Sequence, residues 1–187
     1  VVTPEPTARP TAAPVLDKTP IKISVRKKGK DKFVISWQKR KSAGQYKLWQ
    51  KKQGAKKWKE IKTTKKINYS VKIKPGRYYK YKVTAIYGKK KVIGRSETIT
   101  ACIPGDTKGI SYKRIASRKI SISWIKGKGA KKFIVYRKLP DGDFKKVTTV
   151  NKANYKDLKV AIGKKYVYKI IPVYENDKVK IYGSNTY

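Results

Sequence analysis

The residue types that this sequence lacks limit its chemistry. It has no histidine, no methionine and one cysteine, Cys102, among 187 residues. Histidine is the side chain that most often serves in acid–base catalysis and metal binding, so its absence argues against both. A single cysteine excludes an intrachain disulfide, and we expect Cys102, beside Ile103 and Pro104, to be a packed apolar residue.

Long apolar runs and acidic residues are also scarce. No apolar run approaches the ~18 residues that suggest a membrane-spanning helix, so we expect no membrane span. Only 11 Asp and Glu are present, scattered along a sequence that has no Gly-rich phosphate loop. The stretch PDGDF at 140–144 lacks the further oxygen ligands of a calcium loop and predicts a turn. We therefore expect no enzymatic activity, no cofactor and no metal.

The first residues differ in composition from the rest. Residues 1–17, which begin VVTPEPTARPTAAP, carry no apolar periodicity and predict a Pro/Thr-rich, extended and semi-rigid linker. The sequence has neither an initial methionine nor a signal peptide, which we interpret as a fragment of a longer chain. The other domains of that parent protein are then expected partners.

The residues that are present alternate. The stretch RYYKYKVTAIYGKKK at 77–91 places Tyr79, Tyr81 and Val83 two positions apart, with lysines between the tyrosines. Residues two apart on a strand share one face, whereas a helix would scatter them. The pattern predicts a half-buried antiparallel strand with its lysines in solvent.

The sequence also repeats itself at an offset near 87 residues. FVISWQK at 33–39 matches ISISWIK at 120–126, which aligns Trp37 with Trp124. A repeat of this length is a whole domain, in contrast to the 20–50 residues of a solenoid unit. The sequence therefore divides into two homologous domains, domain 1 at 18–103 and domain 2 at 104–187.

Each domain contains about seven short strand patterns at 8–12-residue spacing. Turn residues such as Gly54, Pro75-Gly76 and Asp141-Gly142 separate them, and no segment has convincing helical periodicity. This pattern predicts an all-β protein of two tandem seven-stranded Greek-key β-sandwiches.

Two features resemble the fibronectin type III module. That family carries a tryptophan in its second strand, here Trp37 and Trp124, and a Pro-Gly followed by tyrosine before its sixth strand. IKPGRYYKYKVTA at 73–85 fits this pattern, with Tyr79 at the position called the tyrosine corner. The resemblance covers about residues 18–187 and implies an immunoglobulin-like fold, without implying one function, because the module is a scaffold with many uses.

The second copy departs from the family pattern at two positions. VAIGKKYVYKIIP at 160–172 keeps Tyr166 but has Ile162 in place of the proline and Pro172 in place of the alanine. The Lys- and Tyr-rich composition is similar to that of modules in large surface or secreted proteins of Gram-positive bacteria. This similarity implies an extracellular location, at the cell surface or secreted, and for such a module we expect a part in cell adhesion.

The four tryptophans divide into two pairs. We expect Trp37 and Trp124 to fill the space between the sheets of their domains. Trp49 and Trp58 should lie on the outer face of a sheet, where we favour a cross-strand aromatic pair shielded by lysine stems. The alternative is a flat carbohydrate-binding platform made by Trp49 and Trp58.

The net charge is +39 and it is uneven. Domain 1 has 28 Lys and Arg against 3 acids, a net +25, and domain 2 has 21 against 6, a net +15. In this topology three loops of domain 1 meet at the end that faces the linker, and their charges should sum within a screening length of ~8 Å. The polyanion-binding residues predicted there, called the cationic pole below, are Lys39, Arg40, Lys41, Lys65, Lys66, Lys89, Lys90 and Lys91.

Such an excess of positive charge favours association with a polyanion. Only eight of the 50 cations are arginine, and no nucleic-acid-binding motif is present, so nucleic acid is not the favoured partner. We expect a non-enzymatic spacer and adhesion module whose outward lysines bind an anionic cell-wall polymer or an acidic glycan. The alternative is a carbohydrate-binding accessory module of a secreted glycan-degrading enzyme.

Overall fold

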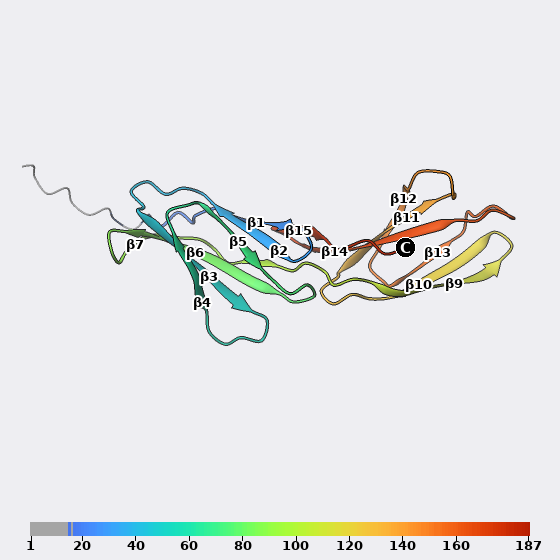
Figure 1. Cartoon of the computed structure of the whole chain (residues 1–187), viewed down its shortest axis with the longest axis horizontal. Coiled ribbons are helices and arrows are strands. Elements are labelled where there is room, and N and C mark those ends of the chain that lie inside the picture. Colours follow the sequence, from blue (N-terminus) through green and yellow to red (C-terminus); the bar gives the residue numbers. More distant parts are fainter. Residues whose placement is uncertain (1–14, 16) are drawn as a thin grey trace, which may run out of the picture.

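The computed structural model describes residues 15 and 17–187, which form two β-sandwiches placed end to end (Figure 1). Residues 1–14 and 16, which are most of the predicted linker, lie outside the described residues. No helix in the described part of the chain is long and apolar enough to cross a membrane. The predicted all-β class with two tandem sandwiches is confirmed.

Domain 1 has one sheet of three strands, in the order β1-β2-β5, and one sheet of five. The larger sheet has the order β4-β3-β6-β7, and β8 also pairs with β6. The seventh strand of the sandwich is therefore split into β7 and β8. The strands are β1 (Ile23–Lys28), β2 (Lys32–Trp37), β3 (Gln45–Lys52), β4 (Lys59–Thr64), β5 (Asn68–Lys72), β6 (Tyr79–Tyr87), β7 (Lys91–Arg95) and β8 (Ile99–Ala101).

Domain 2 repeats this topology with one difference. Its sheets have the orders β13-β10-β9 and β12-β11-β14-β15, and no described strand matches β8. Beyond β15, Ile170 and Thr186 exchange backbone hydrogen bonds of 2.8 and 3.0 Å. The strands are β9 (Lys108–Ala116), β10 (Lys119–Ile125), β11 (Lys132–Lys138), β12 (Lys145–Val150), β13 (Asn154–Asp157), β14 (Val167–Asn176) and β15 (Val179–Tyr182).

The alternation in β6 produces the predicted two-faced strand. Tyr79, Tyr81 and Val83 are buried between the sheets, and Lys80 is exposed. The Tyr81 ring meets Phe33 of β2 edge-on, with ring centroids 6.2 Å apart. Burial of these large rings removes apolar surface from water, which is the main stabilisation available to a fold without disulfides.

The tryptophans of the second strands fill the cores as predicted. Trp37 is 4% exposed and its ring lies 5.8 Å from that of Tyr46. Trp124 is 5% exposed and meets Phe133 edge-on at 5.3 Å. Both indole N–H groups are buried without a hydrogen-bond partner among the described residues. An unpaired buried donor costs free energy, which the burial of the apolar ring has to offset.

Both domains contain the predicted tyrosine corner. The hydroxyl of Tyr79 accepts a 2.8 Å hydrogen bond from the backbone N–H of Lys74. The hydroxyl of Tyr166 accepts a 3.0 Å bond from the backbone N–H of Ala161 in the same way. Each bond reaches five residues back along the chain and fixes the loop that enters the sixth strand. The corner therefore forms in domain 2 although Ile162 replaces the proline.

The β14–β15 hairpin of domain 2 packs onto the end of domain 1. Tyr174, Val179 and Ile181 are buried and belong to the core cluster of domain 1. The side-chain amide of Asn176 donates a 3.1 Å hydrogen bond to the carbonyl of Thr100 at the boundary. The two domains therefore share one apolar core at the junction, which opposes independent motion.

Two glycines allow the loop between β10 and β11 to lie close to the connection between the domains, which runs from Cys102 at the end of domain 1 to Gly105 at the start of domain 2. A Cβ at Gly127 would overlap the backbone carbonyl of Gly105, and one at Gly129 would overlap the sulfur of Cys102. Gly129 also has a φ of 81°, in the left-handed region that favours glycine. Cys102 itself is fully buried, and this burial raises the pKa of its thiol to about 11, as fits a packed apolar residue.

Candidate functional site

The loops of the predicted cationic pole meet at one end of domain 1. Figure 1 places the β2–β3, β4–β5 and β6–β7 loops at the end where the described chain enters, away from domain 2. Seven of the eight predicted cations are exposed there, namely Lys39, Lys41, Lys65, Lys66, Lys89, Lys90 and Lys91. This end is held in place by backbone hydrogen bonds from Ile21 to Arg95 (2.9 Å) and from Asp17 to Ile93 (3.2 Å).

Arg40, the eighth predicted cation, is engaged within domain 1. Its guanidinium forms an ion pair with the carboxylate of Asp17 and donates to the carbonyl of Thr19. Two hydrogen bonds from Thr19, with the nearby charge of Arg40, hold the pKa of Asp17 below its ordinary value. Arg40 therefore ties the start of the domain to the β2–β3 loop, and part of its charge is already compensated.

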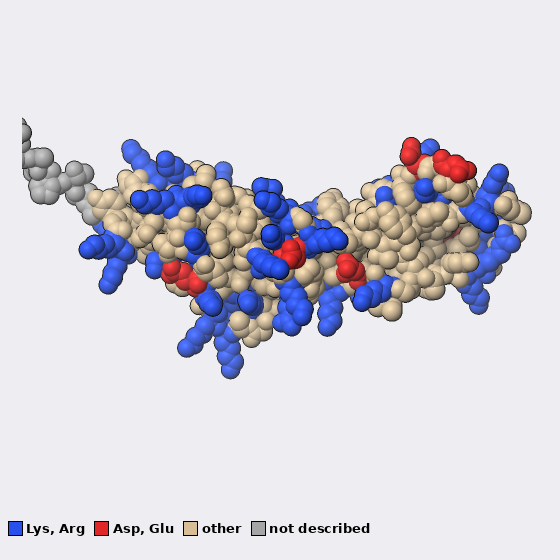
Figure 2. Space-filling view, viewed as in Figure 1, with Lys and Arg blue, Asp and Glu red and all other residues tan. Residues whose placement is uncertain are grey.

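The turn between β3 and β4 carries a second group of cations that the sequence analysis did not single out. This turn projects from the side of domain 1 in Figure 1, and Figure 2 shows lysine and arginine over the same region. Lys52, Lys56 and Lys57 are exposed in and beside this turn. The signal was present in the sequence as KKQGAKK, but the argument from loops that meet at one end passed over it.

The outer aromatic face is covered by lysine in both domains. In domain 1 the ammonium nitrogen of Lys82 lies 4.5 Å from the ring centroid of Trp58 and 5.8 Å from that of Trp49. The indole N–H of Trp49 also donates a 3.2 Å hydrogen bond to Thr84. Such cation–π contacts are worth about 0.5–1 kcal/mol at exposed sites, so a sugar that stacked here would have to displace one.

Domain 2 repeats this stack with different rings. Lys169 lies 4.2 Å from the ring centroid of Phe144 and 4.7 Å from that of Tyr136. The repetition fits the favoured interpretation, a cross-strand aromatic pair shielded by a lysine. The carbohydrate-binding platform of Trp49 and Trp58 stays a prediction.

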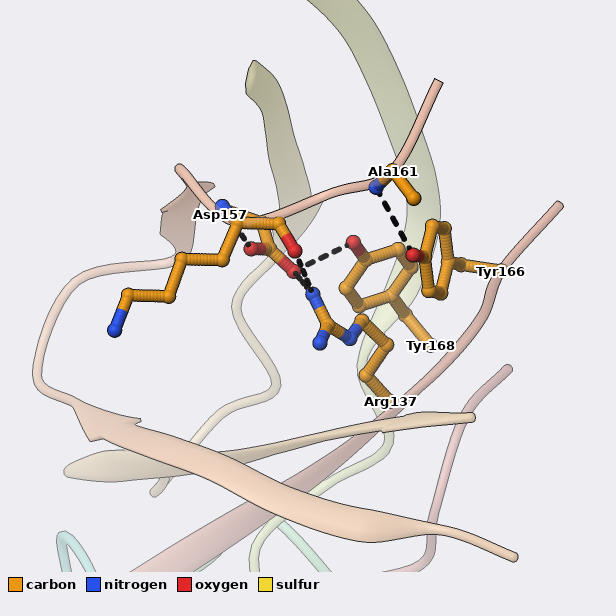
Figure 3. A network of polar contacts seen from close by, with 6 residues as sticks. Arg137, Asp157, Ala161, Tyr166 and Tyr168 are labelled. Atoms are coloured by element: carbon orange, nitrogen blue, oxygen red, sulfur yellow. Dashed lines mark hydrogen bonds and ion pairs between the residues drawn. The ribbon is translucent and has the colours of Figure 1, made fainter. Parts of the chain in front are cut away.

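A buried ionic network in domain 2 departs from the expectation that cations lie outside. Figure 3 shows Arg137 pointing toward Asp157, beside Tyr168. The guanidinium donates to Asp157 at 2.7 Å, and the Tyr168 hydroxyl donates to the same carboxylate oxygen at 2.8 Å. The backbone N–H of Lys159 donates to the other carboxylate oxygen at 3.0 Å, so Asp157, 1% exposed, is fully hydrogen-bonded.

The network changes the acidity of its members. Burial by itself would lower the pKa of Arg137, but the hydrogen bond and the charge of Asp157 outweigh it and raise that pKa. Burial, followed by the hydrogen bond to Asp157, raises the pKa of the Tyr168 hydroxyl well above its ordinary value. At neutral pH the charged guanidinium of Arg137 and the neutral hydroxyl of Tyr168 therefore surround the carboxylate of Asp157. Such an arrangement serves the structure of the domain rather than catalysis.

The described residues offer little else for chemistry. Among them, no three His, Cys, Asp or Glu side chains are grouped so that they could hold a metal ion. The carboxylate of Asp157 is occupied by its three hydrogen bonds, and the Cys102 thiol is buried. Surface charge is the most distinctive functional feature of the chain.

Comparisons with known proteins agree on fold alone. No family model matches the sequence, and no curated protein matches it. The FN1–FN3 segment of chicken contactin (CNTN1) has 18% identity and a TM-score of 0.50, covering 92% of this chain and 65% of that segment. A two-domain fibronectin type III segment of chicken tenascin has 20% identity and a TM-score of 0.46, covering 89% of this chain and 95% of that segment. The chain thus has the fold of tandem fibronectin type III-like modules.

Proposed function

We propose that this chain is a non-enzymatic extracellular spacer and adhesion module of a larger surface or secreted protein, whose cationic pole binds an anionic wall polymer or an acidic glycan. The exposed lysines of three loops at the end of domain 1 carry the proposal. The Lys- and Tyr-rich resemblance to Gram-positive surface proteins supports the extracellular location, and the shared core at the junction supports the spacer role.

The spacer part rests on how the domains are joined. The β14–β15 hairpin buries apolar side chains against domain 1, and the ammonium of Lys178 pairs with the carboxylate of Glu97 across the boundary. The ammonium of Lys27 in β1 donates a 2.9 Å hydrogen bond to the carbonyl of Tyr182 in β15. A module with such a junction holds its two ends apart, whereas a flexible linker would let them approach.

The adhesive part rests on charge. Lysine is a compact, hydrated cation, suited to nonspecific contact with phosphate or sulfate groups. A group of lysines on three adjacent loops raises the local concentration of a polyanion more than scattered lysines do, because their fields sum within a screening length. Salt should weaken the complex steeply.

Matched variants test whether the pole binds the polymer. Lys39→Gln/Lys66→Gln/Lys89→Gln removes one charge from each pole loop, and Lys52→Gln/Lys56→Gln/Lys57→Gln removes the same total charge from the β3–β4 turn. Binding to poly(glycerol phosphate) and to heparin is measured by titration calorimetry at 0.05–0.5 M NaCl. We expect the pole variant to bind more weakly than the turn variant at low salt. Equal weakening would reject the pole, and retention that ignores salt would reject the polyanion.

Two further ligands separate the proposal from its rivals. Binding of a neutral glycan that persists in 0.5 M NaCl and is lost in Trp49→Ala would favour the carbohydrate-binding accessory module. Binding of duplex DNA that wall polymer cannot displace would favour a nucleic-acid role.

A further inference from the structure

The outer face of the larger sheet carries an ion pair in domain 1. Lys47 lies between the buried residues Tyr46 and Leu48 of β3 and therefore points away from the core. Its ammonium donates a 3.0 Å hydrogen bond to the carboxylate of Glu60 in β4, and the hydroxyl of Thr63 donates a 2.5 Å bond to the same carboxylate. These two hydrogen bonds, that from Thr63 first, lower the pKa of Glu60. A cation and a hydroxyl thus hold one carboxylate on this face.

Domain 2 keeps the threonine of this arrangement and loses the ion pair. Ile134 of β11 lies opposite Thr149 of β12, as Lys47 lies opposite its own threonine in domain 1. Lys146 lies in the place of Glu60, because each pairs with the aromatic residue two positions further along the neighbouring strand. An apolar side chain has therefore replaced the lysine, and a lysine has replaced the carboxylate.

The outer face of domain 2 has a hollow of about 370 Å³ at this place. Ile134 and Val173 form its floor, and they are 9% and 2% exposed. Both point away from the core, since the neighbours of Ile134 on β11 belong to the core cluster of domain 2 and Ile134 does not. Val173 lies between Lys132 and Tyr182 on the adjacent strands, whose long side chains cover it. The size is at the small end of the ~300–1,000 Å³ typical of ligand sites.

The three lysines around the hollow differ in what they contact. The carboxylate of Glu175 pairs with the ammonium of Lys132 at 2.8 Å and with that of Lys180 at 3.1 Å. Hydrogen bonds from these two lysines lower the pKa of Glu175. Lys146 is exposed and has no hydrogen bond or ion pair with any described residue. Its charge is therefore free to meet an anion from outside, beside the exposed Thr149.

We propose that this hollow, called the outer site below, binds one sugar residue that carries an anionic group, as a hexuronate or a sulfated hexose does. The anion takes the place beside the threonine that the carboxylate of Glu60 has in domain 1, and Lys146 supplies the cation that Lys47 supplies there. The C–H face of the sugar ring lies on Ile134 and Val173. The outer site is in domain 2, so it does not depend on the cationic pole.

The lining favours a sugar over an acidic peptide. Tyr136 and Tyr182 lie at the sides of the apolar floor, and Glu175 can accept a hydrogen bond from a hydroxyl group. A sugar ring with C–H groups on its face and hydroxyls at its edge matches this arrangement. A peptide would also bring amide groups, and β11 and β14 are each paired on both sides, so neither strand has a free edge to pair with them.

Amide titration by NMR tests the proposal. The probe is methyl β-glucuronide, added to the isotope-labelled chain at ~0.15 M NaCl, where distant charges are largely screened. We expect shifted amide signals at Ile134, Thr149 and Val173, and no such shifts with the neutral methyl β-glucoside or with acetate. Lys146→Gln should weaken binding about tenfold, the lower end for a hydrogen bond to a charged group. Lys152→Gln, which removes an exposed lysine outside the hollow, is the matched control and should bind as the wild type does.

A second variant fills the outer site from within. Ile134→Lys/Lys146→Glu copies the Lys47–Glu60 pair of domain 1 and should abolish binding of the probe. Lys146→Gln changes only an exposed side chain, so it keeps the test valid if the double variant does not fold. Equal affinity in Lys146→Gln and Lys152→Gln would overturn the proposal, and so would equal shifts with acetate or tighter binding of an acetylated tetraglutamate peptide.

The pole variant Lys39→Gln/Lys66→Gln/Lys89→Gln separates this proposal from the proposed function. It leaves the outer site intact and should bind the glucuronide as tightly as the wild type, even where its binding to polymer is weakened. Loss of glucuronide binding in the pole variant would overturn the assignment of the site to domain 2.

Discussion

The equivalent ends of the two domains differ in what they contact. The end of domain 1 carries exposed lysines, and the end of domain 2 packs against domain 1. In domain 1 the loop after the tryptophan strand reads Lys39-Arg40-Lys41, in which both lysines are exposed and Arg40 pairs with Asp17 of the same domain. In domain 2 the same loop reads Lys126-Gly127-Lys128-Gly129 and packs against domain 1. Glycine replaces side chains where backbones meet, and lysines collect where no described residue of the other domain covers the loop. One sandwich topology thus produces a charged tip or a docking surface according to a few loop residues.

The cores differ in a related way. Domain 1 has the neutral pair Gln50 and Tyr81, whose side chains form a 3.0 Å hydrogen bond. Domain 2 has Arg137 and Tyr168 at the matching positions and adds Asp157, which stands opposite Ile120 as Val71 stands opposite Phe33. The same position in the fold therefore accepts either a neutral hydrogen-bonded pair or an ion pair, provided that each buried polar group is hydrogen-bonded.

The largest expected effect comes from removing the buried tryptophan of either domain. It tests whether the two tryptophans contribute equally to the stability of their cores. Trp37→Ala and Trp124→Ala should each lower the free energy of unfolding of their own domain by about 3–5 kcal/mol, because each removes a buried indole. Loss of domain 2 should also lower the melting temperature of domain 1, whose core cluster includes Tyr174 and Ile181. Denaturation followed by domain-resolved amide exchange measures both effects. A variant that melts like the wild type would contradict the core assignment.

The next effect concerns the ionic network. Asp157→Asn should destabilise domain 2 by about 3 kcal/mol, the lower end for breaking a buried ion pair, because Arg137 keeps 26% exposure. The double variant Arg137→Gln/Asp157→Val copies domain 1 and should be at least as stable as the wild type. Gln50→Leu in domain 1 leaves the Tyr81 hydroxyl unpaired and should cost about 1–3 kcal/mol. If the double variant proves to be the least stable of these three variants, the neutral pair of domain 1 cannot replace the ion pair of domain 2.

Much of the fold could be predicted because its signals are local or periodic. Alternation placed Tyr79 and Tyr81 inside, and the repeat aligned the two tryptophans. The Arg137–Asp157 pair was missed because it joins residues 20 positions apart on different strands. An acid at an inward strand position was the available signal. The engagement of Arg40 by Asp17 was missed for a similar reason, since pairing between a strand-end loop and the start of the domain depends on three-dimensional closure.

A third prediction addresses the docked end. Gly129→Ala places a methyl group against the Cys102 sulfur of domain 1 and should cost about 1–3 kcal/mol in the junction, the usual range for overpacking. Each sandwich keeps its own core, so the main readout is shape, measured as a broader distance distribution in small-angle scattering. Gly54→Ala is the matched control for backbone strain, because Gly54 has the same φ of 81° and a Cβ there meets nothing within 4 Å. An unchanged distribution in Gly129→Ala would mean that the junction does not depend on this close approach.

The smallest expected effect compares the ion pairs at the two ends. The hydrogen bond and charge of Lys178 hold the pKa of Glu97 below its ordinary value, and hydrogen bonds from Thr19 do the same for Asp17. A lowered pKa contributes stability above the unfolded value, ~4.3 for Glu and ~3.9 for Asp, and the contribution is lost as pH falls through the folded value. Acid should therefore loosen the Glu97 contact as pH falls below about 4.3, and the Asp17 contact as pH falls below about 3.9. Carboxyl titration by NMR, with amide exchange at Thr100 and Ile21, measures each step. Because both carboxylates are exposed, the loss of stability in acid should be small, and it should become smaller as salt is added. A Glu97→Gln variant that keeps the full acid response at Thr100 would assign the junction's pH dependence to another group.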